Sequence, residues 1–274
     1  MFTRVYVEIT NICNMRCSFC HGHSREPRRM TREEFRQVLE KLEGHTRKVY
    51  YHLMGEPLLH PQLPEFIELA HSRGFQSVLT TNGTLLKKRA AELLQARPHK
   101  ISVSLHSFEE GSEEKHRQYL EDVASFAAEA AQSGIIMVLR LWNRGGDEGR
   151  NDETLTMLYR LLPGEWSETN RGMKIRHKLF LEWGDRFQWP DREAEDGGPA
   201  VYCYGLKDHF GILCDGTVVP CCLDSDGVIN LGNIFRETVP EILAKARTKA
   251  MIEGFRNRNT PEPLCRRCCF ARKF

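Results

Sequence analysis

The stretch Arg4-Val-Tyr-Val-Glu-Ile-Thr10-Asn-Ile-Cys13-Asn-Met-Arg-Cys17-Ser-Phe-Cys20 determines how this chain is organised. Its first half is rich in β-forming residues and predicts a strand over 4–10. Its second half spaces three cysteines as C-x3-C-x2-C directly after that strand. Three thiolates on one short loop can bind three irons of a [4Fe–4S] cluster, which usually has four ligands, so the fourth iron would stay open.

Zinc is the competing metal for this loop. A structural zinc ion is usually coordinated by four protein ligands, whereas the loop supplies only three thiols. His21 or His23 could complete such a site, so zinc stays an alternative at this point.

The segments that follow alternate between strand-like and helix-like patterns. Thr31 and Glu34 form a capping-box pattern that opens a helix to about Leu42. We expect further strands over 48–54, 75–80, 101–105, 135–142 and 174–183, and helices over 63–72, 85–95 and 119–130 and after 151 or 152. This α/β alternation predicts a parallel sheet, and about 180 residues are too few for eight units. A partial (β/α)6 barrel is therefore predicted.

Composition narrows the class of protein. Of the 274 residues 41% are hydrophobic and 28% charged, so the chain can bury a sizeable core. It has neither an apolar run long enough to span a membrane nor a secretion signal, so we expect a cytoplasmic location and no membrane partner. The ten cysteines then favour metal or redox chemistry over a disulfide framework.

The cysteines also divide the chain. Three lie near the N-terminus and seven lie beyond residue 200, with none between them. Glycine, proline and acidic residues gather over 184–200 and indicate a linker. We therefore expect a barrel domain over 1–183, a linker over 184–200, and a small cysteine-rich domain over 201–274, containing a hairpin at 215–216 and a helix over 237–254.

The pattern C-x3-C-x-Phe-C after the first strand resembles the radical S-adenosylmethionine (radical SAM) superfamily. The resemblance implies that Cys13, Cys17 and Cys20 hold a [4Fe–4S] cluster whose open iron binds S-adenosylmethionine. One electron would cleave the cofactor, and the resulting 5′-deoxyadenosyl radical would abstract a substrate hydrogen. The protein would supply binding, orientation and exclusion of water.

The resemblance also implies a cofactor-binding set at the carboxyl ends of the strands. Gly55-Glu56-Pro57 resembles the family's glycine-glutamate motif, although Met54 replaces its first glycine. The remaining expected cofactor contacts are Phe19, Asn82, Ser104 and Arg140. The alternative interpretation is structural: Glu56 as a solvated loop acid, Asn82 as part of a plain turn, and Ser104 as a core hydroxyl.

The C-terminal cysteines resemble the SPASM/Twitch extension of radical SAM enzymes, which carries auxiliary iron–sulfur clusters. By that resemblance one auxiliary [4Fe–4S] cluster would be held by Cys203, Cys221, Cys265 and Cys268. The chain ends shortly after Cys268, which favours the shorter Twitch form. A zinc ribbon using the same four cysteines is the alternative.

One leftover cysteine and one arginine are candidates for catalysis. Cys214, Cys222 and Cys269 are left over, and buried packing explains them. Alternatively one of them substitutes as a cluster ligand or donates a hydrogen atom to a substrate radical, with Cys222 or Cys214 as the donor. The layout also resembles the dehydrogenase of 2-deoxy-scyllo-inosamine, which has an Asn-Arg-Gly-Gly stretch where this chain has 143–146. That resemblance implies that Arg144 faces the substrate.

The expected activity is net oxidation of an unactivated C–H bond in a small molecule or peptide, with a flavodoxin- or ferredoxin-type electron donor. One alternative is a radical peptide maturase, an epimerase or cross-linking enzyme. Another, of a different class, is a zinc-stabilised nucleic-acid-binding module. Nucleic acid is a possible but not favoured partner, since the arginines at 25–32 and 256–272 are explained as solvated surface charges.

Overall fold

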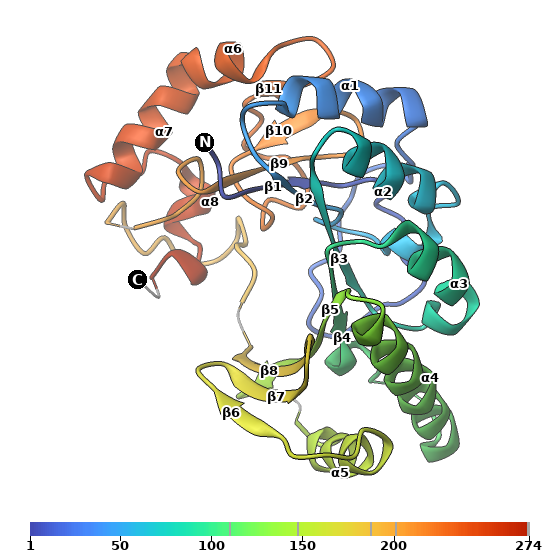
Figure 1. Ribbon diagram of the computed structural model, residues 1–274. Helices are drawn as coiled ribbons and strands as arrows, with labels where there is room; N and C mark the ends of the chain where they lie inside the picture. The colour runs from blue at the N-terminus through green and yellow to red at the C-terminus, as the bar shows by residue number, and fades with distance from the viewer. Residues whose placement is uncertain (110, 147, 187, 201, 273–274) are drawn as a thin grey trace.

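The computed structural model describes residues 1–109, 111–146, 148–186, 188–200 and 202–272. An 11-stranded sheet organises the molecule, in the order β11-β10-β9-β1-β2-β3-β4-β5-β8-β7-β6 (Figure 1). Within the described residues the two end strands of this order do not pair with each other. The sheet is therefore open, and the prediction of a partial α/β barrel is confirmed.

Parallel pairing runs through the centre of the sheet. The parallel strands are β9 (His209–Ile212), β1 (Arg4–Val7), β2 (Lys48–Tyr50), β3 (Gln76–Thr81), β4 (Lys100–Ser104), β5 (Ile136–Arg144) and β8 (Leu179–Asp185). The edges are antiparallel: β10 (Thr217–Val219) and β11 (Gly232–Asn233) extend one, and β7 (Gly172–Arg176) and β6 (Ser167–Thr169) the other. Because β9 pairs with β1, the C-terminal region continues the same sheet.

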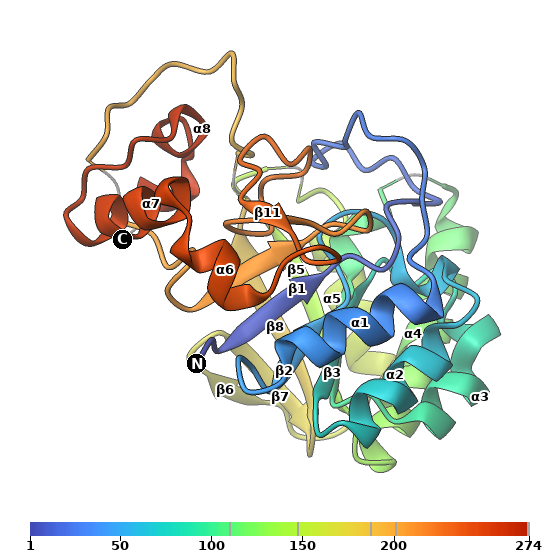
Figure 2. The ribbon, with the colours of Figure 1, turned by 90° about the horizontal axis from the view of Figure 1, so that it is seen from above.

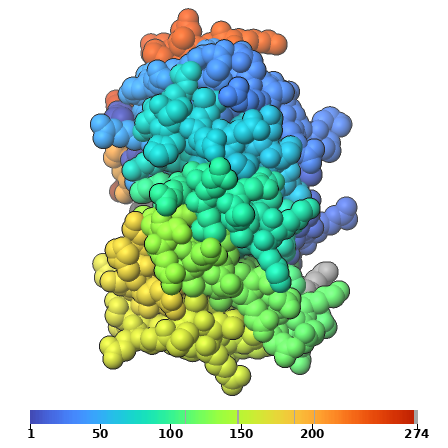
Figure 3. All heavy atoms as spheres, turned by 45° about the vertical axis from the view of Figure 1, so that its right-hand side comes forward, coloured from blue at the N-terminus to red at the C-terminus, as the bar shows by residue number. Residues whose placement is uncertain are grey.

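The first five helices cover one face of the sheet (Figure 1), and Figure 3 shows the blue-to-yellow part of the chain filling that side of the molecule. They are α1 (Arg32–Leu42), α2 (Leu63–Ser72), α3 (Leu86–Ala96), α4 (Glu113–Gln132) and α5 (Asn151–Leu161). The predicted capping box begins α1, where Thr31 accepts from the Glu34 backbone and Glu34 accepts from that of Thr31. Single-turn helices follow two strands: η1 (Pro57–Leu59) after β2 and η2 (Leu105–Ser107) after β4.

Alternate side chains of β1 lie on opposite faces of the sheet, one of which packs against the helices. Val5 and Val7 are fully buried in the main hydrophobic core, on the side of the helices. Tyr6 belongs to a separate small cluster on the other side. Because side chains alternate along a strand, the face away from the helices, here called the inner face, receives Tyr6 and Glu8. Polar groups thus concentrate on the inner face.

Two predicted elements are wrong in detail. The strand expected over 174–183 is a hairpin of β7 and β8, because Lys178 adopts a left-handed conformation with φ 59° and turns the chain. The helix expected over 237–254 is two helices, α6 (Val239–Ala244) and α7 (Ala246–Arg256). Lys245 between them is extended, with ψ 147°, which breaks the hydrogen-bond ladder. The hairpin predicted at 215–216 is confirmed as β9 and β10.

The C-terminal region packs against the start of the sheet. Figure 2 shows α6 and β11 beside α1, and Lys41 at the end of α1 donates to the Ile234 carbonyl at 2.6 Å. The segment that closes the chain contains α8 (Pro263–Arg266) and η3 (Phe270–Arg272). The predicted linker has no regular structure after β8 within its described residues, and its position 187 lies outside them. Among the helices described, none combines the length and apolarity that crossing a membrane requires.

Candidate functional site

The three N-terminal cysteines lie on one loop beyond β1. The Cys17 thiol donates to the Ser107 carbonyl at 3.6 Å, which ties the loop to η2. Cys13 accepts from the Met15 backbone at 3.4 Å, and the Cys20 backbone donates to Cys17. Burial raises the pKa of Cys17 to about 11, and the nearby charges of Glu109, Cys20 and Cys13 raise it further. The thiols are therefore close enough to interact.

The end of β2 is packed directly against this loop. Gly55 adopts φ 76°, and a Cβ there would lie 2.3 Å from the Thr10 carbonyl oxygen, so only glycine permits the approach. The next backbone N–H, that of Glu56, donates to the Ile12 carbonyl at 2.8 Å. Pro57 begins η1 and is buried. The glycine-glutamate motif thus lies beside the residues that lead into Cys13.

The Glu56 carboxylate is buried and fixes the end of the neighbouring strand. It accepts from the Thr81 hydroxyl at 2.7 Å, the Asn82 backbone at 2.8 Å and the Leu58 backbone at 2.9 Å. Burial raises its pKa to about 7, while these three donors act in the opposite direction. The interpretation of Glu56 as a solvated acid is wrong, because the side chain is only 2% exposed.

Asn82 connects the third strand to the cysteine loop. The side-chain nitrogen of Asn82 donates to the Asn14 side chain at 2.9 Å. Its side-chain oxygen accepts from the Thr84 backbone N–H and from the Thr84 hydroxyl. Asn14 in turn donates to Thr84 at 2.9 Å. This closed set of hydrogen bonds orients the loop between Cys13 and Cys17.

Ser104, Arg140 and Phe19 lie along the next strands of the same edge. Ser104, the last residue of β4, is the register partner of Arg140 in the middle of β5. The Phe19 ring lies 4.8 Å from that of His106, which bonds the Arg140 carbonyl at 3.1 Å. The Phe19 carbonyl accepts from the Trp189 indole at 2.9 Å, a contact from the linker that the sequence did not reveal.

A second group of thiols gathers in the C-terminal region. Each thiol of this group interacts electrostatically with at least one other. The group consists of the four predicted ligands and one neighbouring cysteine: Cys203, Cys221, Cys222, Cys265 and Cys268. Burial raises the pKa of Cys203 to about 11 and that of Cys221 well above its ordinary value, and the other thiols raise both further. We call these five residues the C-terminal thiol group.

The remaining cysteines have different surroundings. Cys222 packs against the small cluster around Tyr6 on the inner face, and the Tyr6 side chain lowers the pKa that burial raises. Cys269 is exposed and bonds Gln188 at 3.5 Å. Cys214 is buried, its backbone donates to Glu8 at 3.2 Å, and burial raises its thiol pKa to about 12. Only Cys222 of these three belongs to the C-terminal thiol group.

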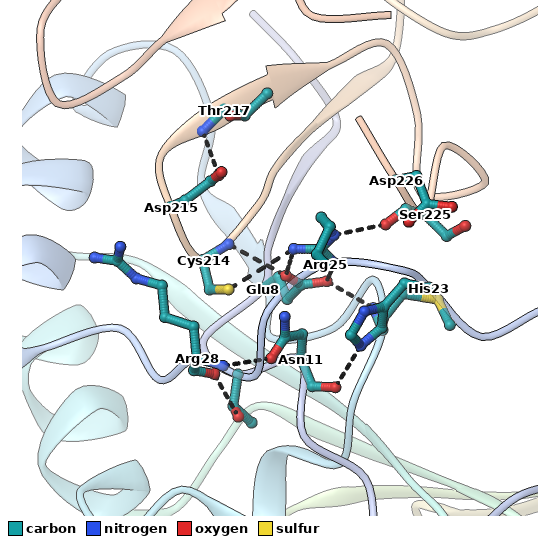
Figure 4. Close-up of polar contacts among 12 residues, drawn as sticks. Glu8, Asn11, His23, Arg25, Arg28, Cys214, Asp215, Thr217, Ser225 and Asp226 are labelled. Atoms are coloured by element: carbon teal, nitrogen blue, oxygen red, sulfur yellow. Dashed lines mark hydrogen bonds and ion pairs between the residues drawn. The ribbon is translucent and has the colours of Figure 1, made fainter. Parts of the chain in front are cut away.

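A buried ion pair joins the two cysteine-bearing regions (Figure 4). Both terminal nitrogens of Arg25 donate to Glu8 at 2.7 Å, and the Arg25 Nε donates to the Ser225 carbonyl at 2.8 Å. Ser24 adds two bonds to Asp226. Glu8 is not among the predicted site residues, although a charged residue in an otherwise apolar segment is a usable signal.

The arginines predicted to face a substrate or to form a basic surface mostly form ion pairs with acidic side chains. Arg144 is exposed at the end of β5, and its Nε lies 3.5 Å from Asp185. Of the arginines over 25–32, Arg28 pairs with Glu34 and Arg32 with Glu65 at 3.6 Å. Their pairing favours the structural interpretation of that basic run over a nucleic-acid surface.

The donor chemistry of both sites fits iron–sulfur clusters. Each group supplies thiols, the ligands preferred by such clusters, and metal binding must displace their protons. The raised pKa values of Cys17 and Cys203 mean that these two thiols hold their protons at neutral pH until a metal displaces them. No trio of His, Cys, Asp or Glu side chains within the described residues is arranged to hold a single metal ion.

The comparisons with solved structures agree with this fold. BtrN, solved with AdoMet and 2-DOIA, superposes with a TM-score of 0.62 at 19% identity over 98% of this chain and 93% of BtrN. Streptococcus suis SuiB, bound to S-adenosylmethionine, gives 0.65 at 16% identity over 98% of this chain and 71% of SuiB.

Among curated proteins, a probable GTP 3′,8-cyclase of Methanococcus maripaludis is 33% identical over 134 residues. The match covers 47% of this chain and 43% of that relative, so the chain spans less than half the length of the relative.

Two family models match the chain. The iron-sulfur cluster-binding domain SPASM matches residues 203–269, and the radical SAM superfamily matches residues 7–162, more than half of the chain. These families bind [4Fe–4S] clusters, and the AdoMet-bound structures agree with the predicted cofactor. The matches set aside the zinc-stabilised nucleic-acid-binding module. The chain belongs to the radical SAM superfamily and carries a C-terminal SPASM domain.

Proposed function

We propose that this radical SAM enzyme carries out a net oxidation at an unactivated C–H bond of a small molecule or peptide. Cys13, Cys17 and Cys20 would hold the catalytic [4Fe–4S] cluster, with S-adenosylmethionine on its open iron. When bound, this pair supplies the radical that removes a substrate hydrogen. Gly55 and Glu56 would shape the cofactor site from the end of β2.

One observation carries the oxidative part of the proposal. Cys222, in the C-terminal thiol group, packs against the small cluster around Tyr6, whose side chain lies on the inner face. Cys203, Cys221, Cys265 and Cys268 would hold an auxiliary cluster that takes an electron from the oxidised substrate. Four thiolates close such a cluster, which suits electron transfer. A flavodoxin or ferredoxin would supply the electron that starts the reaction.

The same Cys222–Tyr6 contact supports a second candidate, a peptide maturase in which Cys222 donates a hydrogen atom. The likeness to GTP 3′,8-cyclases supports ring closure on a nucleotide as a further outcome. Arg144 is proposed to face the substrate in each case, after release from Asp185. The identity of the accumulated product distinguishes these reactions.

The test is anaerobic reconstitution of the full chain, followed by assays for iron, sulfide and zinc and by EPR with and without S-adenosylmethionine. About eight irons, an EPR signal altered by the cofactor, and 5′-deoxyadenosine after reduction would support the proposal. About four irons would remove the auxiliary cluster and, with it, the oxidative step. Zinc in both thiol groups, without cofactor cleavage, would overturn the proposal entirely.

A further inference from the structure

The inner face carries positive charges that the cofactor site does not explain. Lys100 begins β4 and Arg4 begins β1, so both lie at the strand ends opposite to the cysteine loop. Arg140, on β5, acts electrostatically on Lys100. We call Arg4, Lys100 and Arg140 the inner cationic group.

Aromatic rings lie between these cations. The Arg4 Cζ is 5.8 Å from the centre of the Tyr6 ring and 5.9 Å from that of Tyr50, and the two rings are 5.3 Å apart. Both tyrosines also act on the charge of Arg140. Strand alternation places all three cations on the inner face of the sheet, and the charges of Arg4 and Arg140 both act on His52, just beyond β2.

Several buried polar atoms on this face have no hydrogen-bond partner among the described residues. They are Arg4 Nε, His52 Nδ1, Ser102 Oγ, Arg140 Nε and His209 Nδ1. Ser102 is fully buried, and its strand alternation places it on the inner face between Lys100 and Ser104. Buried polar groups are nearly always paired, so a polar ligand bound on this face would satisfy atoms that the chain itself leaves unpaired.

The nearby acids do not balance the charge. Glu182 is the acid that acts on both Lys100 and Arg140, while Glu8 is already paired with Arg25. Burial lowers the pKa of Lys100, and the positive charges of Arg140 and Arg171 lower it further. Glu182 therefore faces several cations at once, namely Lys100, Arg140 and Arg171.

We propose that the inner cationic group binds a phosphate or carboxylate of an anionic small-molecule substrate. The inference rests on the proposed radical SAM function and narrows its substrate class. The anionic group would lie at the amino ends of β1 and β4, and the reacting carbon would extend toward the cysteine loop. The carboxylate of S-adenosylmethionine is the competing ligand, because Arg140 is an expected cofactor contact.

The test is calorimetric titration of anaerobically reconstituted full-length protein at low ionic strength, with S-adenosylmethionine already saturating. Pyrophosphate represents the phosphate source and glutarate the carboxylate source. We expect one of the two to bind, with affinity about tenfold or more weaker in Lys100→Met and in Arg4→Gln. Lys100→Arg, which keeps the charge, should restore most of the binding. Arg256→Gln, whose side chain is 73% exposed on α7, is the matched control and should bind as the wild type does.

Three results would overturn the inference: no anion binding, equal binding in every variant, or binding that is seen only when the titration is repeated without S-adenosylmethionine. Iron content and circular dichroism are measured on each variant, so that loss of folding is recognised separately. Arg4→Gln and Lys100→Arg provide independent readings if Lys100→Met does not fold. Cofactor cleavage by the wild type without added anion tests the proposed function alone, so the two proposals fail in distinguishable ways.

Discussion

The Glu8 carboxylate receives both terminal nitrogens of Arg25, each at 2.7 Å, and the Glu8 side chain is completely buried. Glu8 belongs to the segment that leads from β1 into the cysteine loop, and Arg25 follows that loop. The same carboxylate also accepts from the backbones of Met54 and Cys214. One buried acid thus joins β1, the end of β2 and the C-terminal region.

Replacing Arg25 should destabilise the whole chain. Arg25→Gln leaves Glu8 buried without its ion-pair partner, and breaking such a pair typically costs about 3–5 kcal/mol. Denaturant unfolding of the reconstituted protein measures this loss. Arg256→Gln removes an exposed pair with Glu253 and should change stability by less than about 1 kcal/mol. Equal effects of the two substitutions would contradict a structural role for the Glu8–Arg25 pair.

The auxiliary ligands should be separable from the spare cysteines by iron content. Cys203→Ala removes a proposed ligand, so bound iron should fall from about eight to about four while the N-terminal cluster remains. Cys269→Ala is the matched control, because that thiol is exposed and bonds Gln188. An unchanged iron content in Cys203→Ala would remove Cys203 from the ligand set.

Cys221 and Cys222 are adjacent and both belong to the C-terminal thiol group, so the assignment of the ligand needs its own test. We expect Cys221→Ser to lose the auxiliary iron and Cys222→Ser to keep it, because Cys222 packs against the Tyr6 cluster on the inner face. Iron analysis with EPR distinguishes the two. The reverse result would make Cys222 the ligand and exclude it as a hydrogen-atom donor.

Glu56→Gln should disturb the cofactor site more than the fold. The carboxylate accepts three hydrogen bonds, whereas an amide turns its NH2 group toward one of the donors and leaves that contact repulsive. S-adenosylmethionine affinity should fall about tenfold or more, read from the cofactor-dependent EPR change. Glu65→Gln on the exposed side of α2 is the control. Unaltered affinity in Glu56→Gln would show that the strand ends hold their positions without this acid.

Much of this architecture is readable from the sequence because its determinants are local. The β-rich runs, the Thr31 capping box and the cysteine spacing each involve residues close together in the chain. Gly55 and Glu56 follow the second strand immediately, so the shared edge of a parallel sheet brings them to the cysteine loop.

Contacts between residues far apart in the chain could not be predicted from the sequence in this way. Glu8 meets Cys214, 206 positions away in the chain, and Trp189 meets Phe19 across 170 positions. The division of the expected helix at Lys245 was also missed, because a single extended residue leaves the helical pattern of its neighbours intact. The inner cationic group combines residues from three strands, and no one segment reveals its charge.

His52 should make stability depend on pH. Burial, together with the charges of Arg140 and Arg4, lowers its pKa to about 3, against about 6.5 in the unfolded chain. The unfolded state therefore binds the proton first, so this contribution to stability is complete above about pH 6.5 and is lost as the pH falls toward 3. We expect the free energy of unfolding to decline between pH 7.5 and 5.5, and His52→Gln to flatten that decline. His71→Gln, at an exposed position on α2, should retain the wild-type slope. If His52→Gln keeps the wild-type slope as well, the pH dependence arises elsewhere and His52 is not held neutral by its cationic surroundings.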